Sequence, residues 1–355
     1  MEEVYFSKSS TIYLNRKCPR NCPYCSIVDN SVKEISAEEW CEAFDLMHQE
    51  LGTEFFLILG TEPLVMKKGK LERIVEHLSE RDYEYGFYTT APGHTQDRLF
   101  NLVKNHGLRN VSAGLDYIDE VYESSKPSLP SEIIKLNEES RDLLQTKSLE
   151  TLDMLGKSIQ LGVPEVHCVI TISRMNYLYL PEMIMYLVSR FQDRLHIALN
   201  YVEKGDDYDF DFAPSNITDW HFTERDRTEL EVMVAKVAKV YETCESLMLQ
   251  TPWSYFTDID SLLSLDMPCR VVIPTVDADG TFRKCGYRTG YEIRKYSVFD
   301  LKDKKTEIIK TFEDEVKTCR GCYWSYPTAI REYGEKILDY RSNFWKERRK
   351  IVRGE

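Results

Sequence analysis

Apolar and polar positions alternate along residues 10–200 in a way that predicts strands separated by helices. Short apolar runs, rich in β-branched and aromatic side chains, indicate buried strands. Between them lie segments in which apolar residues recur every three or four positions, the period of an amphipathic helix. The predicted strands are Thr11–Leu14, Glu54–Leu59, Tyr85–Thr89, Asn110–Leu115, Val166–Ser173 and Leu195–Asn200.

The helix that follows the first strand is the best marked. Ser36 is placed to cap its start, Glu39 closes a capping box, and Ile35 and Trp40 suit a hydrophobic staple. Six β/α repeats predict an α/β fold with a parallel sheet and right-handed crossovers, open or curled. The further predicted helices are Leu71–Glu80, Gln96–Asn105, Ser148–Leu161, Pro181–Phe191 and 224–243.

Two segments interrupt this rhythm. The connection 117–147 is long for a loop between a strand and a helix, so we expect it to be functional or disordered and to be able to cover the open end of the sheet. Residues 203–216 are acidic and suggest an exposed boundary. We therefore divide the chain into an α/β domain (8–205), a linker with a helix (206–265), a cysteine-rich unit (266–330) and a C-terminal helix (331–355). Asp277–Gly280 predicts a hairpin within the third unit.

Composition narrows the class of protein. The 355 residues carry a formal net charge of −13, which argues against a duplex nucleic-acid partner because phosphate binding needs a basic face. The N-terminus is acidic and lacks the apolar run of a signal peptide, and no stretch approaches the length of a membrane span. These features predict a cytoplasmic protein, in which the ten cysteines remain reduced and clustered cysteines bind metal.

Three cysteines directly after the first strand, Cys18, Cys22 and Cys25, have the spacing CxxxCxxC. Three thiolates on one loop can hold three irons of a 4Fe–4S cluster and leave the fourth iron open to another ligand. A zinc knuckle is the alternative, but zinc normally takes four ligands in a closed site and no fourth ligand lies nearby in the sequence.

With this motif the chain resembles the radical S-adenosylmethionine (SAM) superfamily over about residues 10–205. Leu59–Pro63 matches the family's Gly-Gly-Glu-Pro motif, with Thr61 in place of the second glycine. The resemblance implies a partial six-stranded (β/α)6 barrel whose open iron binds SAM, and electron transfer that cleaves SAM to a 5′-deoxyadenosyl radical. The residues that it places at the cofactor are Tyr24, Gly60, Thr61, Glu62, Pro63, Thr89, Ser112, Asp116, Asn176 and Asn200.

A second cysteine set follows the barrel: Cys269, Cys285, Cys319 and Cys322, with Gly280 between the first two. This spacing resembles the twitch domain, a short relative of the SPASM domain that carries one auxiliary 4Fe–4S cluster. Four cysteines can ligate such a cluster fully, which favours electron transfer or a structural role. A structural zinc ribbon is the alternative.

Taken together, these motifs predict radical SAM catalysis with a net two-electron oxidation. Arg174 and Arg288 are candidates to face the substrate. The favoured substrate is a small metabolite such as a sugar or aminocyclitol, because the first cluster cysteine is residue 18 and leaves no room for an N-terminal peptide-recognition domain. The alternatives are a ribosomal peptide that is epimerised or cross-linked, and a non-catalytic iron–sulfur or zinc protein. Flavodoxin or ferredoxin is the implied electron donor, and transfer-RNA modification is disfavoured by the acidic charge.

Overall fold

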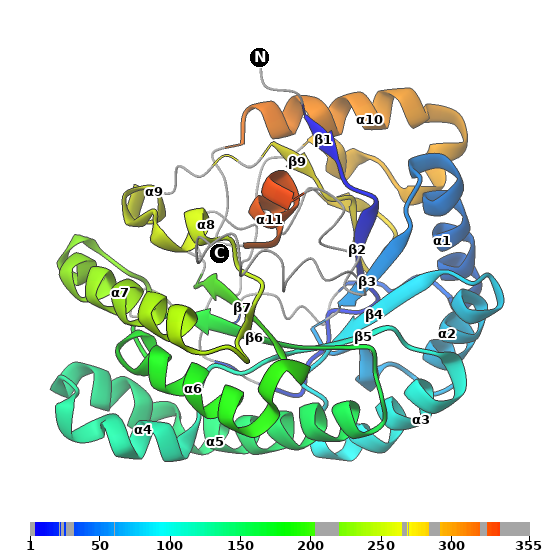
Figure 1. Ribbon diagram of the computed structural model, residues 1–355. Helices are drawn as coiled ribbons and strands as arrows, with labels where there is room; N and C mark the ends of the chain where they lie inside the picture. Colours follow the sequence, from blue (N-terminus) through cyan, green and yellow to red (C-terminus); the bar gives the residue numbers. More distant parts are fainter. Residues whose placement is uncertain are drawn as a thin grey trace.

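The computed structural model describes residues 4–20, 22, 25, 32–59, 61–202, 220–264, 268, 270–283, 292–319 and 325–333. A parallel sheet curls through the centre of the molecule, and helices cover its outer face (Figure 1). Among the described residues, none of the helices combines the length and apolar character that a membrane span requires.

Nine strands form this sheet in the order β11-β10-β2-β3-β4-β5-β6-β7-β8. Among the described strands of this sheet, every neighbouring pair from β10 to β8 is parallel, and only the hairpin β10–β11 is antiparallel. A separate parallel pair joins β1 (Tyr5–Phe6) to β9 (Val271–Val272). The sheet strands are β2 (Ser9–Tyr13), β3 (Phe55–Leu59), β4 (Glu84–Tyr88), β5 (Asn110–Gly114), β6 (Glu165–Ile172), β7 (His196–Tyr201), β8 (Met248–Leu249), β10 (Thr275–Val276) and β11 (Phe282–Arg283).

The six predicted β/α repeats and the parallel sheet are confirmed. The capping box at Ser36 and Glu39 is present at the start of α1. The outer helices are α1 (Ala37–Leu51), α2 (Lys70–Glu80), α3 (Gln96–His106), α4 (Asp119–Ser125), α5 (Ser131–Gln160), α6 (Leu180–Phe191) and α7 (Arg227–Thr243).

The two faces of the sheet differ in character. Phe56 of β3 contacts Phe44 of α1, with ring centroids 4.9 Å apart, so the even-numbered positions of β3 face the helices. Along β7, buried residues alternate with half-buried ones, beginning with half-buried His196. Because successive side chains point to opposite faces of a strand, the half-buried positions line the inside of the partial barrel.

The prediction for residues 117–147 was wrong. Most of this connection is helical: α4 covers part of it, and α5 begins at Ser131, seventeen residues before the predicted start. Polar residues occupy several buried positions of α5, which hides its helical period in the sequence. For example, buried Asn137 donates hydrogen bonds to the carbonyl groups of Ile133 and Met175, both at 2.9 Å. Both helices lie on the outside of the barrel and leave its opening uncovered (Figure 1).

The C-terminal part of the chain is joined to the barrel. The predicted hairpin at Asp277–Gly280 is confirmed, and its strands β10 and β11 extend the barrel sheet beside β2. Sequence analysis missed α10 (Leu301–Lys317), which packs against α1 and β9. Helix α11 (Ser325–Tyr333) contacts β9 and β7 and therefore spans the open side of the sheet (Figure 1). The predicted helix 331–355 lies almost entirely outside the described residues.

The short helices in this part of the chain are α8 (Trp253–Thr257) and α9 (Ile259–Ser264).

Candidate active site

The three cysteines of the CxxxCxxC motif lie at the carboxyl end of β2, the end at which α/β enzymes build their sites. All three are half-buried and form no disulfide. The Cys25 amide donates to the Cys22 carbonyl at 3.0 Å, and the Arg20 amide donates to Cys18 Sγ at 3.4 Å. Burial, together with the negative charges of Glu62, Cys22 and Cys25, raises the pKa of Cys18 to about 12. The three thiols and the Glu62 carboxylate are therefore close enough to interact electrostatically, and a cation is needed to hold the thiols deprotonated. Among the described residues, no three Cys, His, Asp or Glu side chains are grouped so that they could hold a metal ion.

Glu62, in the loop after β3, is fully buried and connects the ends of two strands. Its carboxylate accepts hydrogen bonds from Thr89 Oγ1 at 2.5 Å, from the Thr90 amide and hydroxyl at 2.9 Å each, and from the Leu64 amide at 3.2 Å. Burial raises the pKa of Glu62, and these hydrogen bonds partly oppose the shift. A carboxylate has about four acceptor positions. Glu62 therefore fixes the loop that contains Thr61 and Pro63, and its acceptor positions are already used by the protein.

We expect E62Q to lower the free energy of unfolding by about 1 to 3 kcal/mol, because the Leu64 and Thr90 amides donate to different oxygens of Glu62 and an amide nitrogen in either place leaves one N–H without its acceptor. Urea unfolding of the metal-free protein measures this change. E39Q is the matched control, since Glu39 makes an exposed capping box that glutamine also supports. Equal stability of E62Q and the wild type would show that Glu62 does not hold the loop.

Two residues of the cysteine loop that sequence analysis missed anchor it to the barrel. Asn15 is fully buried; its amide nitrogen donates to the Glu62 carbonyl at 3.0 Å, and its amide oxygen accepts from the Lys17 amide at 2.8 Å. Arg20, between the first two cysteines, forms an ion pair with Glu150 of α5, which also accepts from the Gly93 amide at 3.0 Å. A polar residue directly after an apolar strand was the available signal for Asn15.

A second buried group lies at the ends of β5 and β6. Asp116 accepts from Lys147 Nζ at 2.7 Å and from the Thr171 amide at 2.8 Å. Asn176 donates to the carbonyl groups of Asp116 and Thr171, both at 2.9 Å, and accepts from the Ser173 amide. The structure thus brings Asp116 and Asn176 together, but their polar atoms hold the backbone of the strand ends. Lys147 was missed because it lies in the segment that we predicted as a loop.

The remaining predicted residues are dispersed. Ser112 donates to Asn110 Oδ1 at 2.8 Å within β5. Asn200 Oδ1 accepts from the amide and hydroxyl of Ser325, at 2.9 and 2.8 Å, at the start of α11. Arg174 pairs with Asp226 at 3.1 Å, in a contact that joins the end of β6 to the segment before α7. The predicted site residues outside the described part are Tyr24, Gly60, Cys269, Cys285, Arg288 and Cys322.

Described neighbours of the second cysteine set contact one another. Arg270, next to Cys269 in the sequence, donates from Nη1 to the carbonyl groups of Val316 and Lys317, at 2.9 and 2.6 Å. These carbonyls end α10, directly before Cys319. The structure therefore brings the sequence neighbours of the first and third cysteines together.

Two histidines lie side by side inside the barrel, at the amino ends of β6 and β7. The ring centroids of His167 and His196 are 5.1 Å apart, and the Asn110 amide group lies 3.1 Å from His167 Nε2. Burial lowers the pKa of His196 to about 4, and burial together with the charge of His196 lowers the pKa of His167 well below its usual range. Both rings are neutral in the folded protein near pH 7.

This burial predicts acid sensitivity. Between about pH 6.5, where a histidine of the unfolded chain titrates, and pH 4, the unfolded state binds the His196 proton and the folded state does not. The free energy of unfolding therefore falls as the pH falls through this window, by about 3 kcal/mol from His196. H196Q is expected to flatten the dependence, as measured by urea unfolding at several pH values. The same substitution at the exposed His94 is the control, and an equally steep dependence in H196Q would contradict the assignment.

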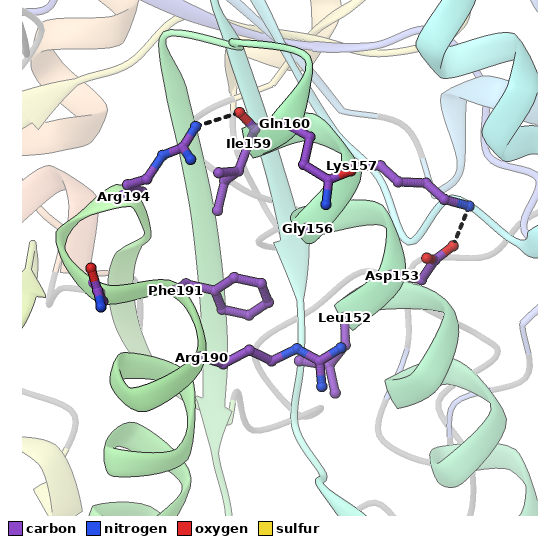
Figure 2. Close-up of a pocket in the computed structure, with 10 residues that line it drawn as sticks. Leu152, Asp153, Gly156, Lys157, Ile159, Gln160, Arg190, Phe191 and Arg194 are labelled. Atoms are coloured by element: carbon purple, nitrogen blue, oxygen red, sulfur yellow. Dashed lines mark hydrogen bonds and ion pairs between the residues drawn. The ribbon is translucent and has the colours of Figure 1, made fainter.

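A hollow outside the barrel is separate from this site. It lies between α5 and α6, and Figure 2 shows Phe191 and Ile159 in its wall, with Arg190, Arg194 and Lys157 around it. Arg194 donates to the Ile159 carbonyl at 2.6 Å, and Lys157 pairs with Asp153 at 2.6 Å. The hollow is at the helix ends that lead into β6 and β7, so it faces the amino ends of the strands, opposite the cysteine loop.

Comparison with known proteins agrees with this geometry. Residues 12–159 match the family model described as the Radical SAM superfamily. The chain is 23% identical over 327 residues to an uncharacterized protein of Archaeoglobus fulgidus, a match that covers 88% of this chain and 71% of the relative. It is 26% identical over 189 residues to the PqqA peptide cyclase of Bradyrhizobium diazoefficiens, covering 52% of this chain and 44% of that enzyme.

The fold is similar to that of SuiB from Streptococcus suis. Against SuiB bound to S-adenosylmethionine the TM-score is 0.55 at 12% identity, covering 79% of this chain and 60% of the other. Against SuiB bound to its precursor peptide SuiA the TM-score is 0.60 at 12% identity, covering 95% and 73%. At this identity the likeness establishes the fold alone.

Proposed function

Since residues 12–159 place this chain in the radical SAM superfamily, we propose that it cleaves SAM reductively and abstracts a hydrogen atom from a peptide substrate. The observation that carries the proposal is the position of Cys18, Cys22 and Cys25 on one loop at the carboxyl end of β2, where the charges of Cys22, Cys25 and Glu62 act on Cys18. The donor set fits a 4Fe–4S cluster, since three thiolates ligate three irons and leave one for SAM. Such a cluster, when reduced, supplies the electron that cleaves SAM to a 5′-deoxyadenosyl radical.

The chain's own residues contribute a rigid frame for this chemistry. Glu62, with its four hydrogen bonds, holds the loop after β3 against the end of β4, and Asn15 ties the cysteine loop to it. The Asp116–Lys147 pair fixes the ends of β5 and β6 in the same way. A site held by buried contacts keeps reacting groups in place without reorganisation. The resemblance to the radical SAM superfamily still proposes these residues as neighbours of the cofactor: Thr61, Thr89, Ser112, Asp116, Asn176 and Asn200.

We further propose that Cys269, Cys285, Cys319 and Cys322 hold an auxiliary 4Fe–4S cluster in a twitch-like unit. The contact of Arg270 with the end of α10 supports this, as does the Asn200–Ser325 contact that docks α11 on β7. An auxiliary cluster would supply electron transfer, which suits a net oxidation. Arg174 and Arg288 remain candidates to contact the substrate. A flavodoxin or ferredoxin would supply electrons in a reducing cytoplasm, a compartment that suits the seven described cysteines, none of which forms a disulfide.

The comparisons favour a peptide over a small metabolite as substrate. One sequence relative with a named activity is a peptide cyclase. The match covers less than half of that enzyme, so a peptide substrate for this chain is itself a proposal. Oxidation of a sugar or aminocyclitol, favoured in the sequence analysis, takes second place because the relatives described above do not support it.

The test is anaerobic reconstitution with iron and sulfide, reduction with dithionite in the presence of SAM, and quantification of 5′-deoxyadenosine. We expect its formation by the wild type and none by a Cys18/Cys22/Cys25→Ala variant. Deuterated candidate peptides and deuterated sugars then identify the substrate class by transfer of deuterium into 5′-deoxyadenosine. A chain that holds its clusters but neither binds nor cleaves SAM would be a non-catalytic iron–sulfur protein and would refute the proposal.

A further inference from the structure

A buried carboxylate, Asp277, joins two arginines that come from opposite ends of the chain. Arg16 Nε donates to Asp277 Oδ1 at 2.9 Å, and Arg16 Nη2 contacts Oδ2. Arg283 donates to Oδ2 from Nε at 2.9 Å and from Nη2 at 2.7 Å. Asp277 is fully buried, and both arginines are at most 9% exposed. Arg16 makes a bidentate contact with both carboxylate oxygens and Arg283 donates twice to Oδ2, so the three side chains are fixed in a single geometry.

Two residues of this triad lie next to the two cysteine sets in the sequence. Arg16 stands two residues before Cys18, and Arg283 stands two residues before Cys285. Asp277 begins the turn between β10 and β11, and β10 pairs with β2, the strand that leads into the cysteine loop. Next to it, the Ala278 carbonyl accepts from the Ile35 amide at 2.9 Å, where the chain emerges from the cysteine loop. The turn at Asp277 thus contacts the first cysteine loop on both sides.

We propose that the Arg16–Asp277–Arg283 triad positions the first cysteine loop by binding this loop to the hairpin that leads to the second cysteine set. Through its charges, the triad also sets the reduction potential of the cluster that the loop holds. The part that concerns the cluster rests on the proposed function. The anchoring part concerns the polypeptide alone and is open to test in the metal-free protein.

The charges of the triad act at short range in a region of low dielectric, where their effect on a neighbouring charge is large. Arg294 shows this coupling, since burial lowers its pKa and the positive charge of Arg16 lowers it further. An iron–sulfur cluster gains a negative charge on reduction, and its potential responds to local charge. Removing the carboxylate and removing a guanidinium change the local charge in opposite directions.

The experiment compares D277N, R16Q and R16K with the wild type after reconstitution. We expect the reduction potential of the cluster at Cys18, Cys22 and Cys25 to shift upward in D277N and downward in R16Q, because the first change makes the site more positive and the second more negative. R16K keeps the charge and loses the planar fork, so its potential stays near that of the wild type. A triad with only a structural role would not give shifts of opposite sign. Shifts of the same sign, or no shift in either variant, would therefore overturn the proposal that the triad sets the reduction potential of the cluster.

The anchoring is measured without metal, as the rate of iodoacetamide labelling at Cys18, Cys22 and Cys25 relative to Cys244, read by mass spectrometry. We expect labelling several-fold faster than in the wild type for D277N, R16Q and R16K. E42Q is the matched control, since Glu42 pairs with Lys302 across a similar separation in the sequence but on the surface. If D277N does not fold, R283Q carries the same test.

Unchanged labelling would overturn the proposal. If the wild-type chain takes up no iron, the proposed function fails, while the labelling rates still decide whether the triad anchors the loop.

Discussion

Replacement of Cys18, Cys22 and Cys25 by alanine is expected to lower the iron content of the reconstituted protein from about eight to about four atoms per chain and to abolish SAM cleavage. The three thiols share one loop and are the proposed ligands of the first cluster, so their loss leaves that cluster without a protein ligand. Iron, acid-labile sulfide and zinc are counted together after anaerobic reconstitution.

Cys244 provides the control for this experiment, because it is half-buried, forms no disulfide and lies outside both cysteine motifs. C244A is expected to keep the full iron content. Replacing Cys319 and Cys322 removes the other four irons if the second set holds a cluster. Zinc at the second set would remove the auxiliary electron-transfer role, and zinc at both sets would contradict the radical SAM proposal itself.

The second large effect is expected in stability, at the Asp116–Lys147 pair. K147M is expected to lower the free energy of unfolding by about 3 to 5 kcal/mol, because it leaves a buried carboxylate without its cation. The side chains of Asp116 and Lys147 are only 3% and 6% exposed. Urea unfolding of the metal-free protein gives the value, and a double variant, K147M/D116N, is expected to recover part of the loss because no buried charge remains.

Lys157 gives a matched control on the same helix. It pairs with Asp153 at 2.6 Å, close to the 2.7 Å of the buried pair, but both side chains are about half exposed. K157M is therefore expected to cost about 0.5 kcal/mol or less, the usual range of an exposed helical pair. Similar losses in K147M and K157M would show that burial does not set the contribution of the Lys147 pair.

Most of the barrel was predictable because its signals are local. The capping box of α1 and the apolar runs of the strands lie within a few residues of one another, and the structure confirms them. Helix α5 was largely missed since buried Asn137 and Lys147 break its apolar period. Their polar groups are satisfied by Met175, Tyr179 and Asp116, partners that are distant in the sequence.

The same reason limits what sequence says about the site. The cysteine spacing identified the loop, and the Glu62 motif identified its neighbour. The Arg16–Asp277 contact joins residues 261 positions apart, so no local sequence pattern predicts it. Sequence analysis also assigned Glu62, Asn176 and Asn200 to the cofactor, whereas the structure commits the Glu62 carboxylate, the Asn176 amide group and Asn200 Oδ1 to intramolecular hydrogen bonds.

The central claim is that the cluster at Cys18, Cys22 and Cys25 has an open iron that binds SAM. The most direct test is the electron paramagnetic resonance spectrum of the reduced, reconstituted protein with and without SAM, including SAM labelled with ¹⁵N at its amino group. The proposal predicts that SAM changes the spectrum of this cluster and that the label adds a nitrogen coupling, both lost in the triple alanine variant. A spectrum that does not change when SAM is added would contradict the proposal.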